Sequence, residues 1–315
     1  MTLKKICEQL NIRAQCKKYG LPLWQCPQFL FVIMGIIIII VIIVSYLVAS
    51  EKIEDPRLVL LIVLSLSAFL VVLDYIIIHS FEKLAEATRM KMEFISIVSH
   101  QLRSPVTNLK YSLESLMSGK LGKIEKTQIE YFKILKENTD RMQELINKIL
   151  TVSRIESGGL IFQKKEVSVV DLVEETILEF KPLLEISNIT IKFKKEENLP
   201  KIFSDPLWIK QVLKNLLDNA IRYQKNKGDI KIMLRKKGKD IYFQISDSGV
   251  GIPKEEQKYI FQKFFRARNI LRNQTNGSGL GLYIVKKVIE KLGGRINFES
   301  KEGKGSTFWF TLPIK

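Results

Sequence analysis

Two long runs without charge dominate the hydrophobic pattern near the start of the chain. Residues 29–49 contain no charged side chain, and residues 58–78 contain only Asp74. Each run is long enough to cross a hydrocarbon core of about 30 Å as a helix. Because only residues 50–57 separate them, we expect a hairpin of two membrane-spanning helices with a short external loop. Asp74 can act within the membrane or reach the interface from the end of its span.

Basic residues flank these runs and predict how the hairpin is oriented. Residues 1–28 carry five Lys or Arg, the loop at 50–57 carries two, and residues 83–91 carry three more. The excess of positive charge found on cytoplasmic flanks predicts that both termini lie in the cytoplasm of a two-pass inner-membrane protein. A loop of eight residues is too short to fold as an external sensor domain.

Helical periodicity continues after the second run. It predicts a helix over 81–117, broken by Gly119 and Gly122, and a second helix over 125–156 that Gly158 ends. Their apolar stripes are Ile95, Val98, Leu102, Val106, Leu109, Leu113 and Leu116 on the first, and Ile129, Phe132, Leu135, Met142, Leu145, Ile149 and Val152 on the second. Two antiparallel helices cannot bury both stripes alone, so we expect a homodimer that forms a four-helix bundle.

From residue 160 the pattern changes to mixed α/β. Strands are predicted over 189–194, 230–235, 241–246, 295–300 and 307–312, and helices over 171–186, 207–223 and 280–292. The fold class is therefore α plus α/β, with four parts: a cytoplasmic segment over 1–28, the hairpin over 29–78, a helical domain over 79–158 and one α/β domain over 159–315.

Charge and cysteines narrow the classes of function. The net charge of +17 suits a solvated surface beside an anionic leaflet. Lys and Arg are scattered without a helix-turn-helix or zinc-finger spacing, which disfavours nucleic-acid binding. The three cysteines all precede the first run and fit no zinc motif, so we expect reduced thiols. Leu3, Ile6 and Leu10 mark one face of an interfacial helix in the same segment.

One of the two histidines, His100, is placed off the apolar stripe of its predicted helix. It is two positions from both Val98 and Leu102, and therefore lies about 200° around the helix from each. This spacing argues against a buried histidine. A chemical role and a solvated surface position both remain open on the local pattern.

Two asparagines and an arginine share one face of the helix predicted over 207–223. At about 100° per residue, Asn219 lies about 40° and Arg222 about 20° from Asn215. Amide oxygens suit Mg²⁺, and a guanidinium suits phosphate. The alternative is an ordinary solvent-exposed polar face that binds no ligand, although Asn is a poor helix former there.

Two glycine-rich segments follow in the same domain. Asp247–Ile252 comes after a predicted strand, where a carboxylate can accept a hydrogen bond from a base amine while glycines let the backbone come close. Gly277–Leu282 opens the helix over 280–292, and its amides and the positive end of the helix dipole can bind phosphate. Each segment alone also reads as a turn.

Taken in order, these segments resemble the motifs of bacterial sensor histidine kinases. Ser99–Pro105 resembles the phosphoacceptor motif and Asn215–Tyr223 the asparagine-containing box, and the remaining nucleotide boxes correspond to residues 247–252, 261–266, 277–282 and 303–308. The resemblance covers about residues 80–315. It implies a dimeric four-helix phosphotransfer domain followed by an ATP-binding α/β sandwich of the Bergerat type.

The resemblance also implies a role for each matching residue. His100 would attack the γ-phosphorus of ATP, because a neutral imidazole is available near pH 7. Asn219, with Asn215, would hold Mg²⁺, and Asp247 would accept the adenine amine, while residues 261–276 would form a lid. The nucleotide-binding set is Asn215, Asn219, Arg222, Tyr223, Asp247, Gly249, Gly251, Ile252, Lys263, Arg266, Gly277, Gly279, Leu280, Gly281 and Ser306.

Gln101 departs from the usual motif, where an acidic residue follows the histidine. An amide oxygen can orient the imidazole but takes up no proton. We expect either a competent, slower autokinase or a chain biased towards dephosphorylating its partner, with Ser104 positioning water. Pro105 frees the carbonyl of Gln101 and can bend the helix.

Three functions compete. The first is a kinase that passes the phosphoryl group to an aspartate in the receiver domain of a separate response regulator, since no receiver sequence follows Lys315. The second is a non-catalytic scaffold that binds ATP as a switch. The third is an ATPase like gyrase, which needs Glu in place of Asn215.

Overall fold

The structure is a computed structural model that describes residues 27–120, 122–224, 228–268 and 277–314. The predicted interfacial helix, the three cysteines and the end of the predicted lid lie outside these residues. The chain divides into two compact units, residues 1–143 with 153–160 and residues 144–152 with 161–315. Helix α5 contributes to both units, and each unit is described by itself below.

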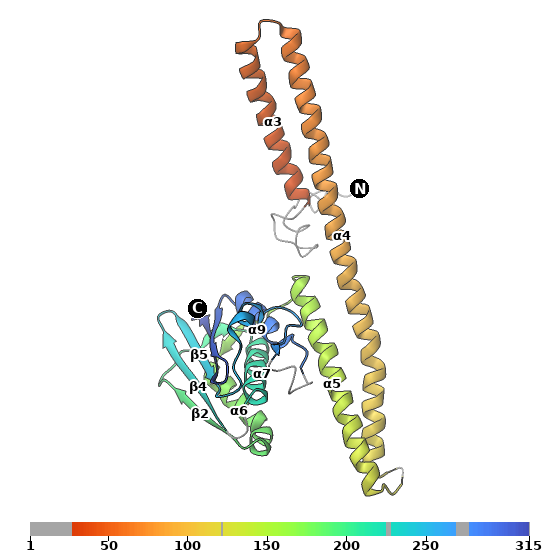
Figure 1. Cartoon of the computed structure of the whole chain (residues 1–315), viewed down its shortest axis with the longest axis vertical. Coiled ribbons are helices and arrows are strands. Elements are labelled where there is room, and N and C mark those ends of the chain that lie inside the picture. Colours follow the sequence, from red (N-terminus) through yellow and green to blue (C-terminus); the bar gives the residue numbers. More distant parts are fainter. Residues whose placement is uncertain (1–26, 121, 225–227, 269–276, 315) are drawn as a thin grey trace. The chain divides into compact units, whose positions relative to one another are not determined.

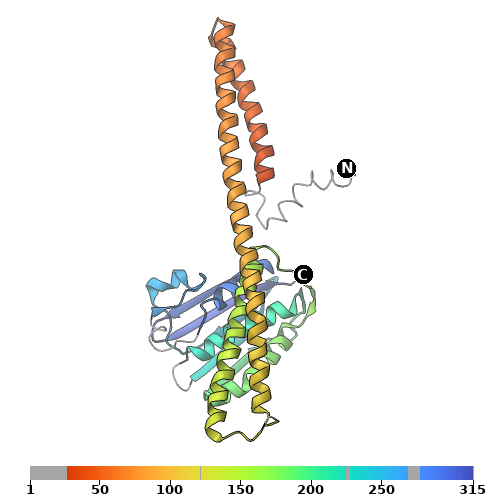
Figure 2. The same ribbon diagram turned by 90° about the vertical axis from the view of Figure 1, so that its right-hand side faces the viewer.

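The first unit begins with two long apolar helices, α3 (Pro27–Lys52) and α4 (Pro56–Met117), which lie side by side (Figures 1 and 2). Asp55 caps α4 by accepting a 2.9 Å hydrogen bond from the amide of Arg57, and Pro56 supplies a preformed first turn. Both helices are long and apolar enough to cross a membrane, and almost none of either apolar segment is buried within the chain.

Helix α4 continues for 62 residues as one element (Figure 2). It contains both the second apolar run and the segment around His100, so the predicted continuous helical connection between them is confirmed. Pro105 lies inside α4 and does not end it.

Helix α5 (Lys126–Glu156) runs antiparallel to α4. Glu125 and Gln128 form a capping box at its start, in which the Gln128 side chain accepts from the Glu125 amide at 3.0 Å. Lys110 donates to Asp140 at 2.7 Å across the pair of helices. Gly158, with φ of 68°, follows the end of α5, as its position in the sequence predicts.

The second unit is built on a five-stranded sheet in the order β2-β4-β5-β7-β6, whose strands are β2 (Ile189–Lys195), β4 (Gly228–Lys237), β5 (Asp240–Ser246), β6 (Arg295–Lys301) and β7 (Gly305–Pro313). Only the β2–β4 pair is parallel. Figure 1 shows α6 (Val169–Ile186), α7 (Pro206–Arg222) and α9 (Gly281–Lys291) on one side of it. The five strands and three helices predicted from the pattern are confirmed.

The core of this unit lies between the sheet and its helices. Phe243 and Phe310 stack at 4.9 Å between ring centroids on neighbouring strands, and both are 2% exposed or less. From α7, Ile209, Val212 and Leu216 are at most 1% exposed. This packing fixes α7 against the sheet and leaves its other face for function.

Three short elements are not predicted by the sequence pattern. Strand β1 (Lys165–Val167) pairs antiparallel with β3 (Ile202–Ser204), and η2 (Lys254–Tyr259) is a short 3₁₀ helix. Three residues are too few to show an alternation, so tertiary pairing alone creates these strands.

Asp205 ties three segments together at the start of α7. Its Oδ1 accepts from the amides of Leu207 and Trp208 at 2.9 and 3.3 Å, and its Oδ2 accepts from the amide of Gln163 at 2.7 Å. The residue is 2% exposed, so these three donors have little access to water when the carboxylate is removed.

We therefore predict that Asp205→Ala lowers the free energy of unfolding of the α/β unit by about 2 kcal/mol. Asp171→Ala, at an exposed position in the first turn of α6, is the matched control and should change it by less than about 0.5 kcal/mol. Urea unfolding followed by tryptophan fluorescence measures both, and equal effects would contradict this role of Asp205.

Candidate functional site

The imidazole of His100 lies on the solvent side of α4. His100, Gln101 and Ser104 are all exposed, whereas Ser99 is 4% exposed. His100 is therefore not a buried histidine of the hydrophobic core, and its side chain is accessible for reaction.

The apolar stripes beside His100 are only partly covered within one chain. Val106, Leu113, Ile146 and Val152 are buried. By contrast, the exposed fractions of Leu102, Leu109, Leu116, Leu135, Met142 and Leu145 range from 38% to 52%. The prediction that two helices cannot bury both stripes alone is confirmed.

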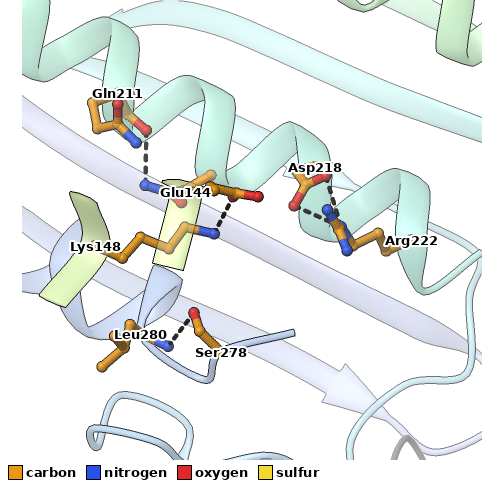
Figure 3. A network of polar contacts seen from close by, with 8 residues as sticks. Glu144, Lys148, Gln211, Asp218, Arg222, Ser278 and Leu280 are labelled. Atoms are coloured by element: carbon orange, nitrogen blue, oxygen red, sulfur yellow. Dashed lines mark hydrogen bonds and ion pairs between the residues drawn. The ribbon is translucent and has the colours of Figure 1, made fainter. Parts of the chain in front are cut away.

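Asn215 is buried and does not belong to a solvent-exposed polar face. It is 7% exposed, and its Nδ2 donates to the backbone oxygen of Gln211 at 3.0 Å (Figure 3). Its Oδ1 lies 3.3 Å from the point that a Cβ on Gly281 would occupy. The amide oxygen therefore faces the first turn of α9, and Asn219 lies one turn further along α7, half-buried.

Arg222 is held by a carboxylate on its own helix. Its Nε donates to both oxygens of Asp218, at 2.7 and 2.8 Å (Figure 3). Burial lowers the pKa of the Arg222 guanidinium, but Asp218 and, more weakly, Glu144 raise it, and the net shift is upward. Glu144 comes from α5, where it pairs with Lys148 (Figure 3). Arg222 thus keeps its charge while its direction is set by Asp218.

Asp247 begins the loop after β5 and is oriented by backbone donors. Its Oδ1 accepts from the amides of Gly249 at 2.9 Å and Ser306 at 3.2 Å. No hydrogen bond to Oδ2 is found among the residues that the structure describes. Burial raises the pKa of this carboxyl, and the two backbone donors oppose the shift. One carboxylate oxygen is used in positioning, and the other remains available to a ligand.

Glycine is required in this loop because backbone segments meet there. A Cβ on Gly249 would lie 2.1 Å from the carbonyl oxygen of Tyr223, and one on Gly305 would lie 2.1 Å from that of Asp247. Gly251 has φ of 65°, in the left-handed region. The loop therefore packs directly on the end of α7 and the start of β7.

Among the described residues, no side chain caps the first turn of α9. Its N-cap, Leu280, makes no side-chain capping hydrogen bond, and Ser278 Oγ accepts only a 3.4 Å contact from the Leu280 amide (Figure 3). Gly279, with φ of 66°, lies against the backbone of Phe264. An uncapped helix start next to Asn215 is a ready site for phosphate oxygens.

The described part of the predicted lid lies beside α9 and the segment that precedes it. Lys263 Nζ lies 5.4 Å from the ring centroid of Tyr283 on α9. The side chain of Arg266 lies beside Gly277, with its Nε 3.6 Å from the position of a Cβ there. Burial raises the pKa of the Tyr223 hydroxyl, and the positive charge of Arg266 opposes that shift.

Three positioning residues were missed by sequence reasoning. Gln224 bonds to Ser248 through both its amide atoms, at 3.0 and 3.1 Å. Ser300 Oγ accepts from the amide of Ile252 at 2.9 Å, and Gln257 Nε2 donates to the carbonyl of Ser300 at 2.9 Å. None of the three belongs to a recognisable motif, since only the fold brings them to the loop.

The structure brings the predicted nucleotide set together in the second unit, around α7, the loop after β5 and the start of α9. His100, Gln101 and Ser104 belong to the first unit. Among the described residues there is no group of three or more His, Cys, Asp or Glu that could hold a metal ion. The amide oxygens of α7 beside an uncapped helix start instead suit Mg²⁺ held jointly with phosphate.

Comparisons with known families match both units. Residues 90–158 match the His Kinase A (phospho-acceptor) domain, and residues 204–315 match the histidine kinase-, DNA gyrase B- and HSP90-like ATPase. The two matches include His100 in one case and the whole of α7, the loop after β5 and α9 in the other.

Named sensor kinases match most of the length of this chain. The circadian input-output histidine kinase CikA of Synechococcus elongatus is 34% identical over 72% of this chain and 30% of its own length. The alginate biosynthesis sensor protein KinB of Pseudomonas aeruginosa is 31% identical over 79% of this chain and 40% of its own length. The chain therefore spans less than half the length of these relatives.

Solved structures show the same fold. Full-length ShkA in complex with AMPPNP has a TM-score of 0.60 and 25% identity, covering 70% of this chain and 46% of that one. Histidine kinase ThkA in complex with the response regulator protein TrrA has a TM-score of 0.51 and 24% identity, covering 72% of this chain and 64% of that one.

We predict that Gly249→Ala abolishes nucleotide binding, because a Cβ 2.1 Å from the Tyr223 carbonyl must push the loop away from α7. Gly238→Ala, in the β4–β5 turn, is the control: a Cβ there meets nothing within 4 Å, and its φ of 63° adds backbone strain away from the loop, so stability falls slightly while affinity stays unchanged. Calorimetric titration with a non-hydrolysable ATP analogue measures the affinity, and circular dichroism checks folding. Unchanged binding by folded Gly249→Ala would contradict the proposed close approach.

Proposed function

This chain belongs to the sensor histidine kinases, and from that premise we propose that it transfers the γ-phosphoryl group of ATP to its own His100 and then to an aspartate of a response regulator. The observation that carries the proposal is the convergence of Asp247, Asn215 and the uncapped start of α9 on one site, in a chain that also exposes a histidine on a helix.

The nucleotide is oriented by side chains and backbone together. Asp247 Oδ2 accepts a hydrogen bond from the adenine amine, while Oδ1 stays fixed by Gly249 and Ser306. The free amides at the start of α9 receive phosphate oxygens. Bound Mg²⁺, held by the amide oxygens of Asn219 and Asn215, supplies charge neutralisation. Arg222 and Arg266 add positive charge near the phosphates.

The transfer step requires little covalent chemistry from the protein. A nitrogen of neutral His100 forms a bond to the γ-phosphorus as the bond to the β,γ-bridging oxygen breaks, and the imidazole proton passes to solvent. Gln101, exposed next to His100, orients the ring but takes up no proton. Catalysis is therefore mainly positioning and charge stabilisation.

The exposed apolar stripes support a dimer. Six residues of the apolar stripes, among them Leu102, Leu109 and Leu145, are more than a third exposed on one chain. Packing them against a second copy would bury them in a four-helix bundle. The phospho-acceptor family that matches residues 90–158 supports the same assembly.

The two apolar helices support anchorage in the membrane. Both α3 and α4 are long enough to span it, and the positive flanks favour cytoplasmic termini. We propose a two-pass protein of the cytoplasmic membrane. The phosphoryl acceptor is a response regulator, a partner class seen with ThkA.

We predict that the full chain, incubated with γ-labelled ATP and Mg²⁺, acquires an acid-labile label that His100→Gln abolishes. His79→Gln, which removes the other histidine from α4, is the matched control and should keep the label. Gel autoradiography after acid treatment measures both variants.

Two other results would overturn this assignment. Nucleotide binding without any label would indicate a scaffold that uses ATP as a switch. Steady release of phosphate without labelled protein would indicate a gyrase-like ATPase, for which Asn215 lacks the required carboxylate.

We predict a pH dependence of nucleotide affinity from Asp247. Because burial raises the pKa of this carboxyl, it takes up a proton at a higher pH than an ordinary aspartate. The protonated oxygen no longer accepts well from the adenine amine, so affinity falls as the pH drops through the raised pKa and is full above it.

Titration calorimetry between neutral and mildly acidic pH measures this effect. Asp247→Asn is the control: it should bind more weakly at neutral pH and lose the part of the pH dependence that belongs to this carboxyl. An identical pH profile for both proteins would contradict the role of Asp247.

A further inference from the structure

Within the described part of the chain, no helix packs on one face of the five-stranded sheet. Helices α6, α7 and α9 all pack against the other face (Figure 1). Alternate residues of β2 and β4 point away from those helices, and most of them are exposed. The resulting surface, which we call the basic face, comprises Lys192, Lys194, Lys231, Arg235 and Lys237.

Positive charge on the basic face is poorly compensated. Lys192 pairs with Asp229, and Asp240 lies opposite Lys237 in the β4–β5 register. Among the residues that the structure describes, Lys194 and Lys231 have no acidic partner. Lys231 also lies directly opposite Lys192 in the β2–β4 register. Like charges placed side by side destabilise the isolated unit, which favours an anionic partner for this face.

The centre of the face identifies the kind of anion. Arg235 and Lys237 cover the ring of Tyr242, at 5.0 and 5.5 Å from its centroid, and Tyr242 is 7% exposed. A single-stranded nucleic acid binds by stacking its bases on exposed aromatic rings. With the Tyr242 ring covered and Trp309 half-buried on the same face, this surface chiefly presents cationic side chains on a sheet, which suits phospholipid headgroups.

The connection between the second apolar run and the second unit is short. The 2.7 Å contact between Lys110 and Asp140 sets the antiparallel register of α4 and α5. In that register Gly158 lies opposite about residue 92, roughly 20 Å along α4 from the end of the apolar run near Ile78. A domain of about 155 residues has a radius of gyration of about 15 Å. The stretch of α4 between the apolar run and the level of Gly158 is thus no longer than the domain is wide.

We propose that the basic face docks on anionic phospholipid headgroups of the leaflet next to α3 and α4. The proposal rests on the membrane anchorage proposed above and is independent of phosphoryl transfer. It assigns part of the net charge of +17 to a defined surface of the α/β unit.

The test uses the full chain in lipid nanodiscs, with Cys7, Cys16 and Cys26 replaced by Ser. A donor fluorophore is attached through Thr190→Cys, on the same face of the sheet, or through Leu178→Cys, on α6 and 69% exposed. Energy transfer to acceptor-labelled headgroups is compared between phosphatidylcholine discs and discs containing one-third phosphatidylglycerol. Transfer from position 190 should rise in the anionic discs and return to the neutral value in high salt.

Charge reversal provides the matched variants. Lys194→Glu with Lys231→Glu should remove the rise, since each basic residue near an anionic surface contributes about fivefold to association. Lys181→Glu with Lys201→Glu changes the net charge equally at exposed positions outside the basic face and should retain it.

Three outcomes would overturn the proposal. These are equal transfer in both kinds of disc, equal losses for the two double variants, and an oligonucleotide-binding activity that needs Lys194 and Lys231 without any lipid effect. Labelling of His100 with ATP, measured on the same samples, reports separately on the proposed kinase activity.

Discussion

The burial of one face of α7 is the constraint on which the α/β unit depends. Ile209, Val212 and Leu216 are at most 1% exposed between the sheet and the neighbouring helices. Burying such side chains contributes about 1.5–3 kcal/mol each. Once this face is fixed, the opposite face must carry Asn215 and Asn219 towards the start of α9. The capping of α7 by Asp205 sets where the helix begins, and therefore how far along the helix the Asn215 and Asn219 side chains lie.

Backbone contacts complete the site. The loop after β5 rests on the end of α7 through Gly249, and Asp247 is clamped by amides from its own loop and from β7. Side chains outside the motifs, such as Gln224 and Ser300, hold the same loop from two directions. A site built this way is preorganised, because its ligand-facing groups are set before the nucleotide arrives.

The first unit depends on a different principle. Helix α4 joins an apolar segment to the exposed His100 without a break, and its stripe stays partly uncovered on one chain. A change in the apolar segment therefore reaches the histidine through a single element, and a second copy of the chain is the natural cover for the stripe.

Hydrophobic periodicity and ordered motifs alone determined the long helices, the five strands and the exposure of His100. These features repeat over many residues or follow from fixed spacings, so local pattern suffices to predict them. Only the tertiary structure decided that Asn215 is buried, that Asp218 directs Arg222, that β1 pairs with β3, and that scattered lysines gather on one face of the sheet. The burial of Asn215, the pairing of β1 with β3 and the gathering of the lysines depend on residues far apart in the chain, whose contacts exist only once the sheet order and the packing of its helices are set, whereas Asp218 and Arg222 are four residues apart on one helix and their pairing needed only the choice of side-chain direction.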